Sequence, residues 1–310
     1  MRSSRILESD LARRRDMRTE VEITVINDRI PGGPETVLGL AKCGPDVAVA
    51  DEGDYWTDIT LDEKDERLPL LLSLLKERGI TWIERRRDRF TDEELESARL
   101  LAMEYFSPAG SIFAGPRVGT KYDMGKACMR CGAGARQTSA MVVDGQELHV
   151  IEGRRAAATC YNDMLVDEKL AGALAQSGAT GITFRGVFAA FEGRGHFQLP
   201  WRQLCATHTM PPMSPRSTGI EPYKPCTCRR SSFTTPREIP TRLVYRASDL
   251  ADIRDVNVTW EWFGEVNFNG DVYDSVLPFP LFLVTPKIRR IFRDAGATGF
   301  DWIPIRVVDE

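Results

Sequence analysis

The residues best suited to chemistry in this chain are cysteines, and two of them stand in the pattern Cys128-Met129-Arg130-Cys131-Gly132. Two thiolates separated by two residues can face one ion from a single tight turn. The glycine that follows lets the backbone turn back without a clash at Cβ. The pattern therefore predicts half of a structural zinc site, in which four cysteine sulfurs hold the metal in a tetrahedron.

The second half of this site is predicted at Cys226-Thr227-Cys228, where the spacing is one residue shorter and no glycine follows. Residues 207–240 around it are rich in proline, serine and threonine, and a bound metal would offset the cost of ordering them. Cys205 and His208 offer a competing second half, because three cysteines and one histidine are equally good zinc ligands. Four protein ligands leave no open position for water, so the zinc is expected to be structural.

The composition of the chain indicates in which cellular compartment it works and which classes of partner to expect. The seven cysteines are an odd number, and no apolar signal segment follows the basic first residues, which favours a reducing cytoplasm over disulfides. A formal net charge of −4 among 310 residues gives no general reason to expect nucleic acid as a partner. No apolar run is long enough to span a bilayer, so we expect no membrane association.

The common signatures of catalysis and nucleotide binding do not occur in the sequence. The isolated histidines lack a nucleophile or a carboxylate at meaningful spacing, so no catalytic residue is predicted. The two Gly-Ala-Thr-Gly blocks, residues 178–181 and 296–299, resemble phosphate-binding loops. They follow predicted helices instead of preceding them, which favours helix C-caps.

Two groups of residues could meet a protein partner. The acidic stretch that includes Asp51, Glu52 and Asp54 could attract a basic surface and raise the rate of association, or could simply be a solvated loop. Trp260 and Trp262 could anchor a partner, because tryptophan is enriched in binding hot spots. Packing in the core of a strand is the alternative interpretation of these two tryptophans.

These residues must be positioned by two predicted α+β domains. Residues 1–16 form a basic arm that we expect to be disordered, and residues 17–106 alternate between strand and helix patterns in a small α+β domain. The stretch at 107–119 is rich in proline, glycine and serine and marks the predicted boundary. Residues 107–310 form the predicted second α+β domain, which contains both cysteine pairs.

The end of the first domain is predicted as a strand followed by a helix. Residues 80–83 have the pattern of a strand, and the charged run at 84–89 is expected to follow it. Thr91 and Glu94 form a capping box, which predicts a helix that extends to about Met103. In the second domain, Asp144-Gly145 is a strong turn signal between two strand-like runs, 139–143 and 147–151, and predicts a hairpin.

The second domain contains an internal repeat. Residues 165–184 and 283–302 match without a gap, and they share the Leu-Val start, Lys169 with Lys287, and the Gly-Ala-Thr-Gly block. Each copy has the pattern of a strand, a helix, a glycine C-cap and a returning strand. The sequence therefore predicts a repeated β-α-β element in two related lobes, with one cysteine pair upstream of each copy.

The CxxCG pattern at Cys128, the second cysteine cluster and the ending LVTPKIRRIFRDAGATGFDWIPI (residues 283–305) together resemble the double-CXXCG motif family of myxobacteria. The ending is also similar to the wider immunity-11 group. The resemblance covers roughly residues 107–310 and implies an immunity protein of a contact-dependent polymorphic toxin system, which binds a cognate protein toxin in the cytoplasm. The second cysteine pair departs from the family pattern, because it has lost one spacer residue and the glycine.

We therefore expect a non-enzymatic α+β binding protein that carries a structural zinc and neutralises a toxin. One alternative is a hydrolytic or nucleic-acid-modifying enzyme with a cleft between the lobes, which would need a convergent set of polar side chains. The other is a zinc-ribbon adaptor for nucleic acid, which the arginines at 85–87 and 229–230 favour and the negative overall charge opposes.

Overall fold

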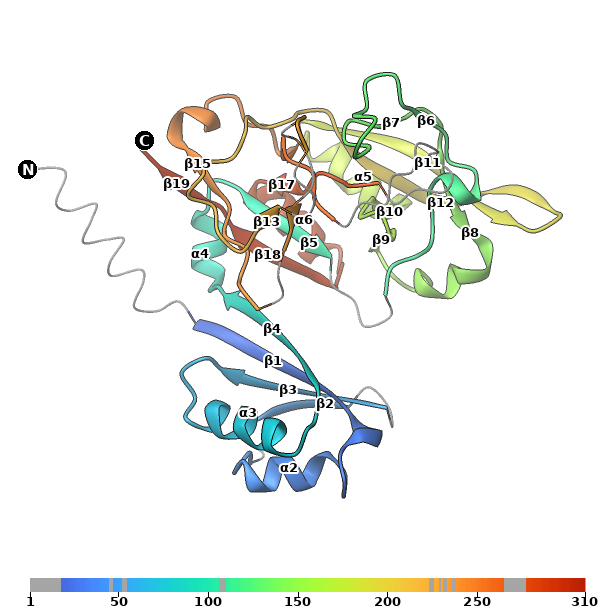
Figure 1. Cartoon of the computed structure of the whole chain (residues 1–310). Coiled ribbons are helices and arrows are strands. Elements are labelled where there is room, and N and C mark those ends of the chain that lie inside the picture. Colours follow the sequence, from blue (N-terminus) through green and yellow to red (C-terminus); the bar gives the residue numbers. More distant parts are fainter. Residues whose placement is uncertain are drawn as a thin grey trace, which may run out of the picture. The chain divides into compact units, whose positions relative to one another are not determined.

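The structure contains both helices and strands, which confirms the predicted α+β class (Figure 1). The computed structural model describes residues 18–44, 47–51, 55–105, 110–222, 226–228, 230, 233–235, 238–264 and 277–309, so the predicted arm at 1–16 lies outside it. The chain divides into two compact units. Unit 1 takes in the described residues up to Thr91 and a short segment that ends at Thr241, and unit 2 takes in the rest. In the described part, no helix has both the length and the apolar character needed to cross a lipid bilayer.

Unit 1 is an antiparallel four-stranded sheet with helices packed against one face. The strand order is β2-β3-β1-β4, and alternate residues of β1 are buried against the helices. A 3₁₀ turn at Asn27–Arg29 follows β1. The strands are β1 (Arg18–Ile26), β2 (Ala48–Asp51), β3 (Trp56–Asp62) and β4 (Trp82–Arg89), and the helices are α2 (Pro34–Leu40) and α3 (Arg67–Glu77).

The charged run at 84–89 belongs to strand β4, so the prediction that it follows the strand was wrong. Its arginines can occupy a strand because β4 is the edge of the sheet and acidic side chains of β1 face them. Arg85 lies 3.6 Å from Glu22, and Arg89 lies 2.6 Å from Glu20. Ion pairing across the strands thus replaces the alternation of apolar residues that normally identifies a strand.

Unit 2 contains two larger sheets, with strand orders β8-β11-β12-β10-β9 and β16-β17-β5-β18, and three two-stranded pairings, β6-β7, β13-β14 and β15-β19. Its helices are α4 (Asp92–Ser97), α5 (Glu168–Gln176) and α6 (Pro286–Asp294), with 3₁₀ turns at Pro116–Val118, Gly145–Val150 and Ala247–Leu250. Its strands are β5 (Leu101–Tyr105), β6 (Tyr122–Asp123), β7 (Arg136–Gln137), β8 (Met141–Asp144), β9 (Ala156–Ala158), β10 (Met164–Asp167), β11 (Ile182–Phe191), β12 (Gly195–Ala206), β13 (Glu221–Pro222), β14 (Phe233–Thr234), β15 (Val244–Arg246), β16 (Val256–Val258), β17 (Phe282–Val284), β18 (Phe300–Pro304) and β19 (Arg306–Val308).

The predicted helix up to Met103 ends at Ser97, and β5 follows it as a central strand between β17 and β18. Leu101, Ala102 and Met103 are at most 1% exposed, so both faces of this strand are buried. A short run that is apolar on both faces has no strand alternation and cannot be told from a buried helix. Because β5 pairs with strands near the C-terminus, it belongs to unit 2. The division along the chain therefore falls after Thr91 and not at the predicted boundary, 107–119.

The predicted hairpin around Asp144-Gly145 does not form. Strand β8 ends at Asp144, a 3₁₀ turn occupies Gly145–Val150, and β8 pairs in parallel with β11. The Asp144 carboxylate accepts a hydrogen bond from the backbone N–H of Gln146 at 2.9 Å, which favours the turn over a returning strand.

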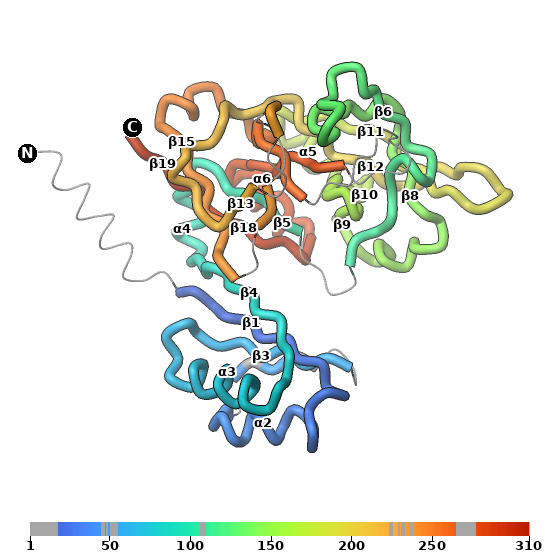
Figure 2. The backbone as a smooth tube through the Cα atoms, in the orientation of Figure 1, coloured from blue at the N-terminus to red at the C-terminus, as the bar shows by residue number. Residues whose placement is uncertain are grey.

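The internal repeat is confirmed as a structural repeat. The first copy is β10-α5-β11 and the second is β17-α6-β18, which lies at the red end of the chain in Figure 2. In each copy one antiparallel strand separates the two strands that the helix connects, β12 in the first copy and β5 in the second. Gly178 and Gly296 follow the two helices with φ of 65° and 76°, as helix C-caps require.

Candidate metal centre

The first cysteine pair lies in the loop between β6 and β7, and backbone hydrogen bonds shape that loop. The N–H groups of Cys131 and Gly132 both donate to the carbonyl of Cys128, at 3.2 and 2.7 Å, while the N–H of Cys128 donates to Ala133 at 2.8 Å. Gly132 has a φ of 75°, which favours glycine at this position. The turn predicted from the CxxCG spacing is therefore present, and it presents both sulfurs from one side of the loop.

The second cysteine pair lies between β13 and β14, where the chain has little regular structure. Trp262 packs against the cysteines and donates its backbone N–H to the carbonyl of Arg230 at 2.6 Å, so the segment after Cys228 is tied to the chain around Trp262. Cys131 is only 3% exposed, and the remaining three cysteines are half-buried. The four thiols are thus largely withdrawn from water.

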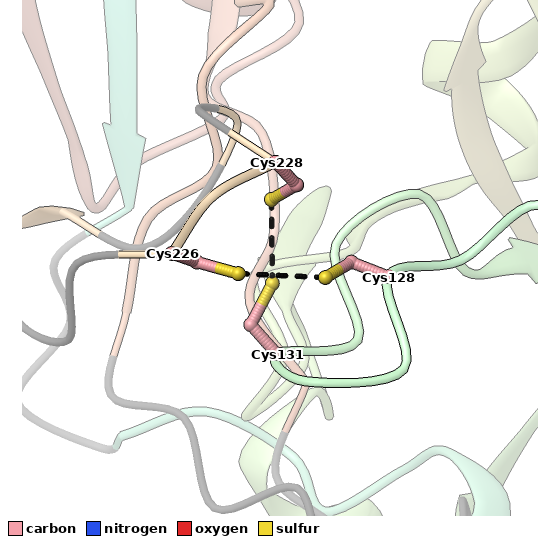
Figure 3. Close-up of side chains that lie close together, drawn as sticks. All are labelled: Cys128, Cys131, Cys226 and Cys228. Atoms are coloured by element: carbon pink, nitrogen blue, oxygen red, sulfur yellow. Dashed lines mark hydrogen bonds between the residues drawn. The ribbon is translucent and has the colours of Figure 1, made fainter.

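The structure brings the four predicted cysteines together. Their sulfurs all lie within 4.8 Å of one another, with 3.4 Å between Cys128 and Cys226 and 3.6 Å between Cys131 and Cys228. Figure 3 shows the four side chains directed toward a common centre. A tetrahedron with metal–sulfur bonds of about 2.3 Å has sulfurs about 3.8 Å apart, so the spacing suits one metal ion. The cluster could therefore hold a metal, as the sequence predicted.

The competing second half, Cys205 with His208, is not part of this cluster. Cys205 stands near the end of β12, and its thiol contacts the carbonyl of Gln203 at 3.8 Å. Burial raises the pKa of the Cys205 thiol to about 11, although the charge of Arg185 opposes this. Such a thiol is a poor source of the thiolate that metal binding needs. The alternative was therefore wrong, because Cys205 at the end of β12 and His208 after it do not belong to the group of cysteines around Cys128 and Cys131.

Of the residues predicted to bind a partner, the structure describes the side chains of the two tryptophans but not those of the three acidic residues. Glu52 and Asp54 lie outside the described residues, as does the side chain of Asp51, whose backbone belongs to β2. Trp262 packs on the cysteines, and the ring of Trp260 lies 5.4 Å from the guanidinium of Arg230. Both tryptophans are half-buried and make these contacts within unit 2. A role for them toward a partner stays a prediction.

A polar network that no sequence pattern indicated surrounds Asp163. Its carboxylate accepts hydrogen bonds from the Thr159 hydroxyl at 3.2 Å and from the Gln203 amide at 2.9 Å, and Gln203 also exchanges amide hydrogen bonds with Gln137. Burial of the carboxyl raises the pKa of Asp163 to about 6, while these bonds and Arg185 oppose the rise. The contributing residues come from four separate segments, so only the folded chain shows that they meet.

Glu261, between the two tryptophans, is a second buried acid that sequence reasoning missed. One carboxylate oxygen accepts the backbone N–H of Met213 at 2.9 Å, and the other has no hydrogen-bond partner among the described residues. Burial raises the pKa of Glu261, and the charge of Arg230 opposes the rise. The acid therefore supports the segment that carries Trp262, next to the cysteine cluster.

Comparison with models of known protein families finds no match to this chain, and comparison with curated proteins finds none either.

Proposed function

We propose that Cys128, Cys131, Cys226 and Cys228 bind one structural zinc ion. The observation that carries the proposal is the convergence of four sulfurs, from segments nearly 100 residues apart, within 4.8 Å of one another. Thiolate ligands suit zinc, and a set of four cysteines closes its tetrahedral coordination. A closed site leaves no position for water or substrate, so the ion would hold the fold together and take no part in a reaction.

We further infer that the chain is a non-enzymatic immunity-type protein that binds and neutralises a cognate protein toxin. Support comes from the resemblance of the cysteine pattern and of residues 283–305 to the toxin-immunity families. A structural zinc agrees with this role, because a recognition protein needs a rigid surface more than it needs a reactive group. The reducing cytoplasm expected from cysteine usage is also where thiolates remain free to bind metal.

Metal analysis of the purified full-length protein tests the zinc. We expect about one zinc per chain in the wild type and a clearly lower zinc content in Cys228→Ser, because the loss of one of four thiolate ligands weakens binding. Cys205→Ser is the matched control, since Cys205 is also half-buried but lies outside the cluster, and it should keep its zinc. Equal zinc contents in the two variants would contradict the assignment.

Co-expression tests the neutralisation. A candidate toxic domain, taken from the coding sequence next to the gene for this chain, is expressed alone or together with the full-length protein. We expect cell growth only when both are present, and a stable complex of the two purified proteins. Continued killing despite soluble, zinc-loaded protein would overturn the toxin assignment and leave the zinc assignment intact.

A further inference from the structure

Strand β12 extends beyond its neighbour β10 and leaves a stretch of sheet edge without a partner. β10 pairs with β12 only at residues 201–204, whereas β11 follows β12 along its other side as far as Gly195. Among the described residues, no strand pairs with residues 195–200 on the side away from β11. The tip of this hairpin extends clear of the rest of the sheet in Figure 1. Backbone groups along such an edge can still accept another strand.

A groove of about 540 Å³ lies at this unpaired edge. Leu199, Pro200 and Trp201 of β12 line it, together with residues 167–169 at the start of α5 and residues 151–154. Its apolar surface comes from Leu148, Ile151, Leu199 and Trp201, which belong to the core cluster of this sheet or pack against it. The groove is therefore an open continuation of the hydrophobic core.

Aromatic side chains extend the apolar surface along the hairpin. Phe197 shares a sheet face with core residues Ala189 and Val143, yet it is 50% exposed. Its ring meets that of Phe191 edge-to-face, with centroids 5.8 Å apart. The unpaired edge and the exposed aromatic ring thus belong to the same few residues of β12.

We propose that this groove binds an extended, mainly apolar segment of a protein partner, which adds to the sheet as a strand beside residues 195–199. The unpaired backbone of β12 would supply hydrogen bonds, and alternate side chains of the segment would enter the groove. Two of the charged side chains that line the groove are paired with arginines of the same chain. Asp167 lies 2.6 Å from Arg155, and Glu168 lies 2.9 Å from Arg202. The preference for an apolar segment follows from the apolar side chains of the groove, Leu148, Ile151, Leu199 and Trp201.

A second copy of the chain fits this edge less well. Pro200 lacks an N–H, and the pairing of β11 with β12 is irregular between Gly186 and Phe188. Proline and bulges are features by which natural sheets limit edge-to-edge association. A small apolar molecule could fill the groove, but it would leave the backbone of 195–199 unpaired.

This inference deepens the proposed function by naming the surface that would receive the toxin, and only the identity of the partner rests on that function. It is tested without a toxin, by selecting binders to the full-length protein from a phage-displayed library of random peptides. We expect enriched peptides with alternating apolar residues and low charge. When a synthetic peptide of the most enriched sequence binds, amide hydrogen exchange should slow at residues 195–199.

Substitutions in the protein test whether the selected peptide binds at the groove beside β12. Phe197→Glu and Leu199→Arg should weaken binding of the selected peptide at least about ten-fold, because a charge replaces an apolar contact. Val307→Glu is the matched control, since Val307 is an exposed apolar residue of β19 outside the groove, and it should change the affinity less than about two-fold. Phe197 is half exposed, so its replacement should leave the circular dichroism spectrum and thermal midpoint unchanged.

Three outcomes would overturn the proposal. One is a selection without enriched peptides, and another is a peptide that binds all variants equally or slows exchange elsewhere. The third is a dimer of the protein alone with slow exchange at residues 195–199, which would assign the edge to self-association. Failure of toxin neutralisation with intact peptide binding would instead reject the proposed function and leave the groove as a binding site.

Discussion

Gly181 is the residue at which the first β-α-β copy meets the sheet of the second. A Cβ atom at this position would lie 2.2 Å from the carbonyl oxygen of Val256, and φ is 75°. The neighbouring Thr180 accepts the N–H of Val256 at 3.1 Å and donates its own N–H to the Asp255 carboxylate at 2.9 Å. The close approach of the two backbones therefore depends on a residue without a side chain.

Replacing Gly181 with alanine should destabilise the protein much more than replacing Gly178. Both glycines have positive φ, so each substitution strains the backbone by about 1 kcal/mol. Only at Gly181 does the new methyl group also overlap a backbone atom, and we expect a total loss of about 3 kcal/mol or more. Urea denaturation of the two variants and the wild type measures the difference. Equal losses would show that the two copies are not held together at this point.

Asp163 should make stability fall as pH rises. Its pKa is about 6 in the folded protein and about 3.9 in an unfolded chain, so the folded state holds the proton more tightly. The stabilisation is full below pH 4 and is lost as pH rises through 6, with a total of about 3 kcal/mol. Although the residue as a whole is only partly buried, its carboxyl is cut off from water, which is why burial is the main cause.

Comparison with Asp163→Asn isolates this contribution. The free energy of unfolding is measured for both proteins from pH 4 to pH 8. We expect the difference between wild type and variant to change by about 2–3 kcal/mol across that range, with the wild type relatively weaker at high pH. A difference independent of pH would mean that the carboxyl is ionised throughout and that its hydrogen bonds outweigh the cost of burial.

Short elements of this fold are held by contacts with distant elements more than by their own propensity. Helix α4 has six residues, and it is attached to α6 by an ion network around Glu96. Glu96 accepts a hydrogen bond from Arg289 at 2.9 Å and also pairs with Arg290. Arg289 is 8% exposed, so its charge depends on these partners. The capping box alone would not keep so short a helix folded.

Glu96→Gln should destabilise unit 2 by about 1–2 kcal/mol, because it leaves the buried Arg289 with less compensating charge. The matched control is Asp252→Asn, which breaks the exposed pair of Asp252 with Arg254 at 3.0 Å and should cost less than about 0.5 kcal/mol. Thermal unfolding of both variants at low salt measures the two effects. A larger loss for Asp252→Asn would refute the argument from burial.

Elements with a local signal could be predicted from the sequence, and elements defined by distant partners could not. Spacing alone indicated the CxxCG turn at Cys128. The shared Gly-Ala-Thr-Gly blocks made the two β-α-β copies recognisable by alignment. Strand β5 carries no alternation because other strands cover it on both edges and its faces are buried. The Asp163 network is formed by residues from several segments, and its members have no common spacing. The sequence therefore revealed the cysteine site but not the polar network.

At the scale of the whole molecule, the cysteine cluster joins segments that are otherwise far apart in the chain. The pairs Cys128–Cys226 and Cys131–Cys228 span 98 and 97 residues. Each segment has few backbone pairings of its own, since β6-β7 and β13-β14 are two residues long. A cross-link that closes a loop of about 100 residues contributes about 4–5 kcal/mol in the entropic description. A metal at this site would thus contribute much of the stability of unit 2.

Removal of the metal should therefore lower the thermal transition of unit 2 and leave that of unit 1 in place. The four cysteines all belong to unit 2, whereas unit 1 has a separate apolar core that includes Ile23, Leu71 and Leu75. In calorimetry of the full chain with a chelator, we expect the unit 2 transition to fall by about 10 °C. Added zinc should restore it and magnesium should not, because thiolates select the softer ion.

Cys228→Ser should unfold close to the temperature of the chelated wild type and respond less to chelator than the wild type does, since its site is already incomplete. Cys205→Ser should behave as the wild type does, before and after chelation. If the chelator shifted both transitions together, the ion would be holding the units to each other. If it shifted neither, the four thiols would pack as small apolar side chains, and burial alone would account for their convergence.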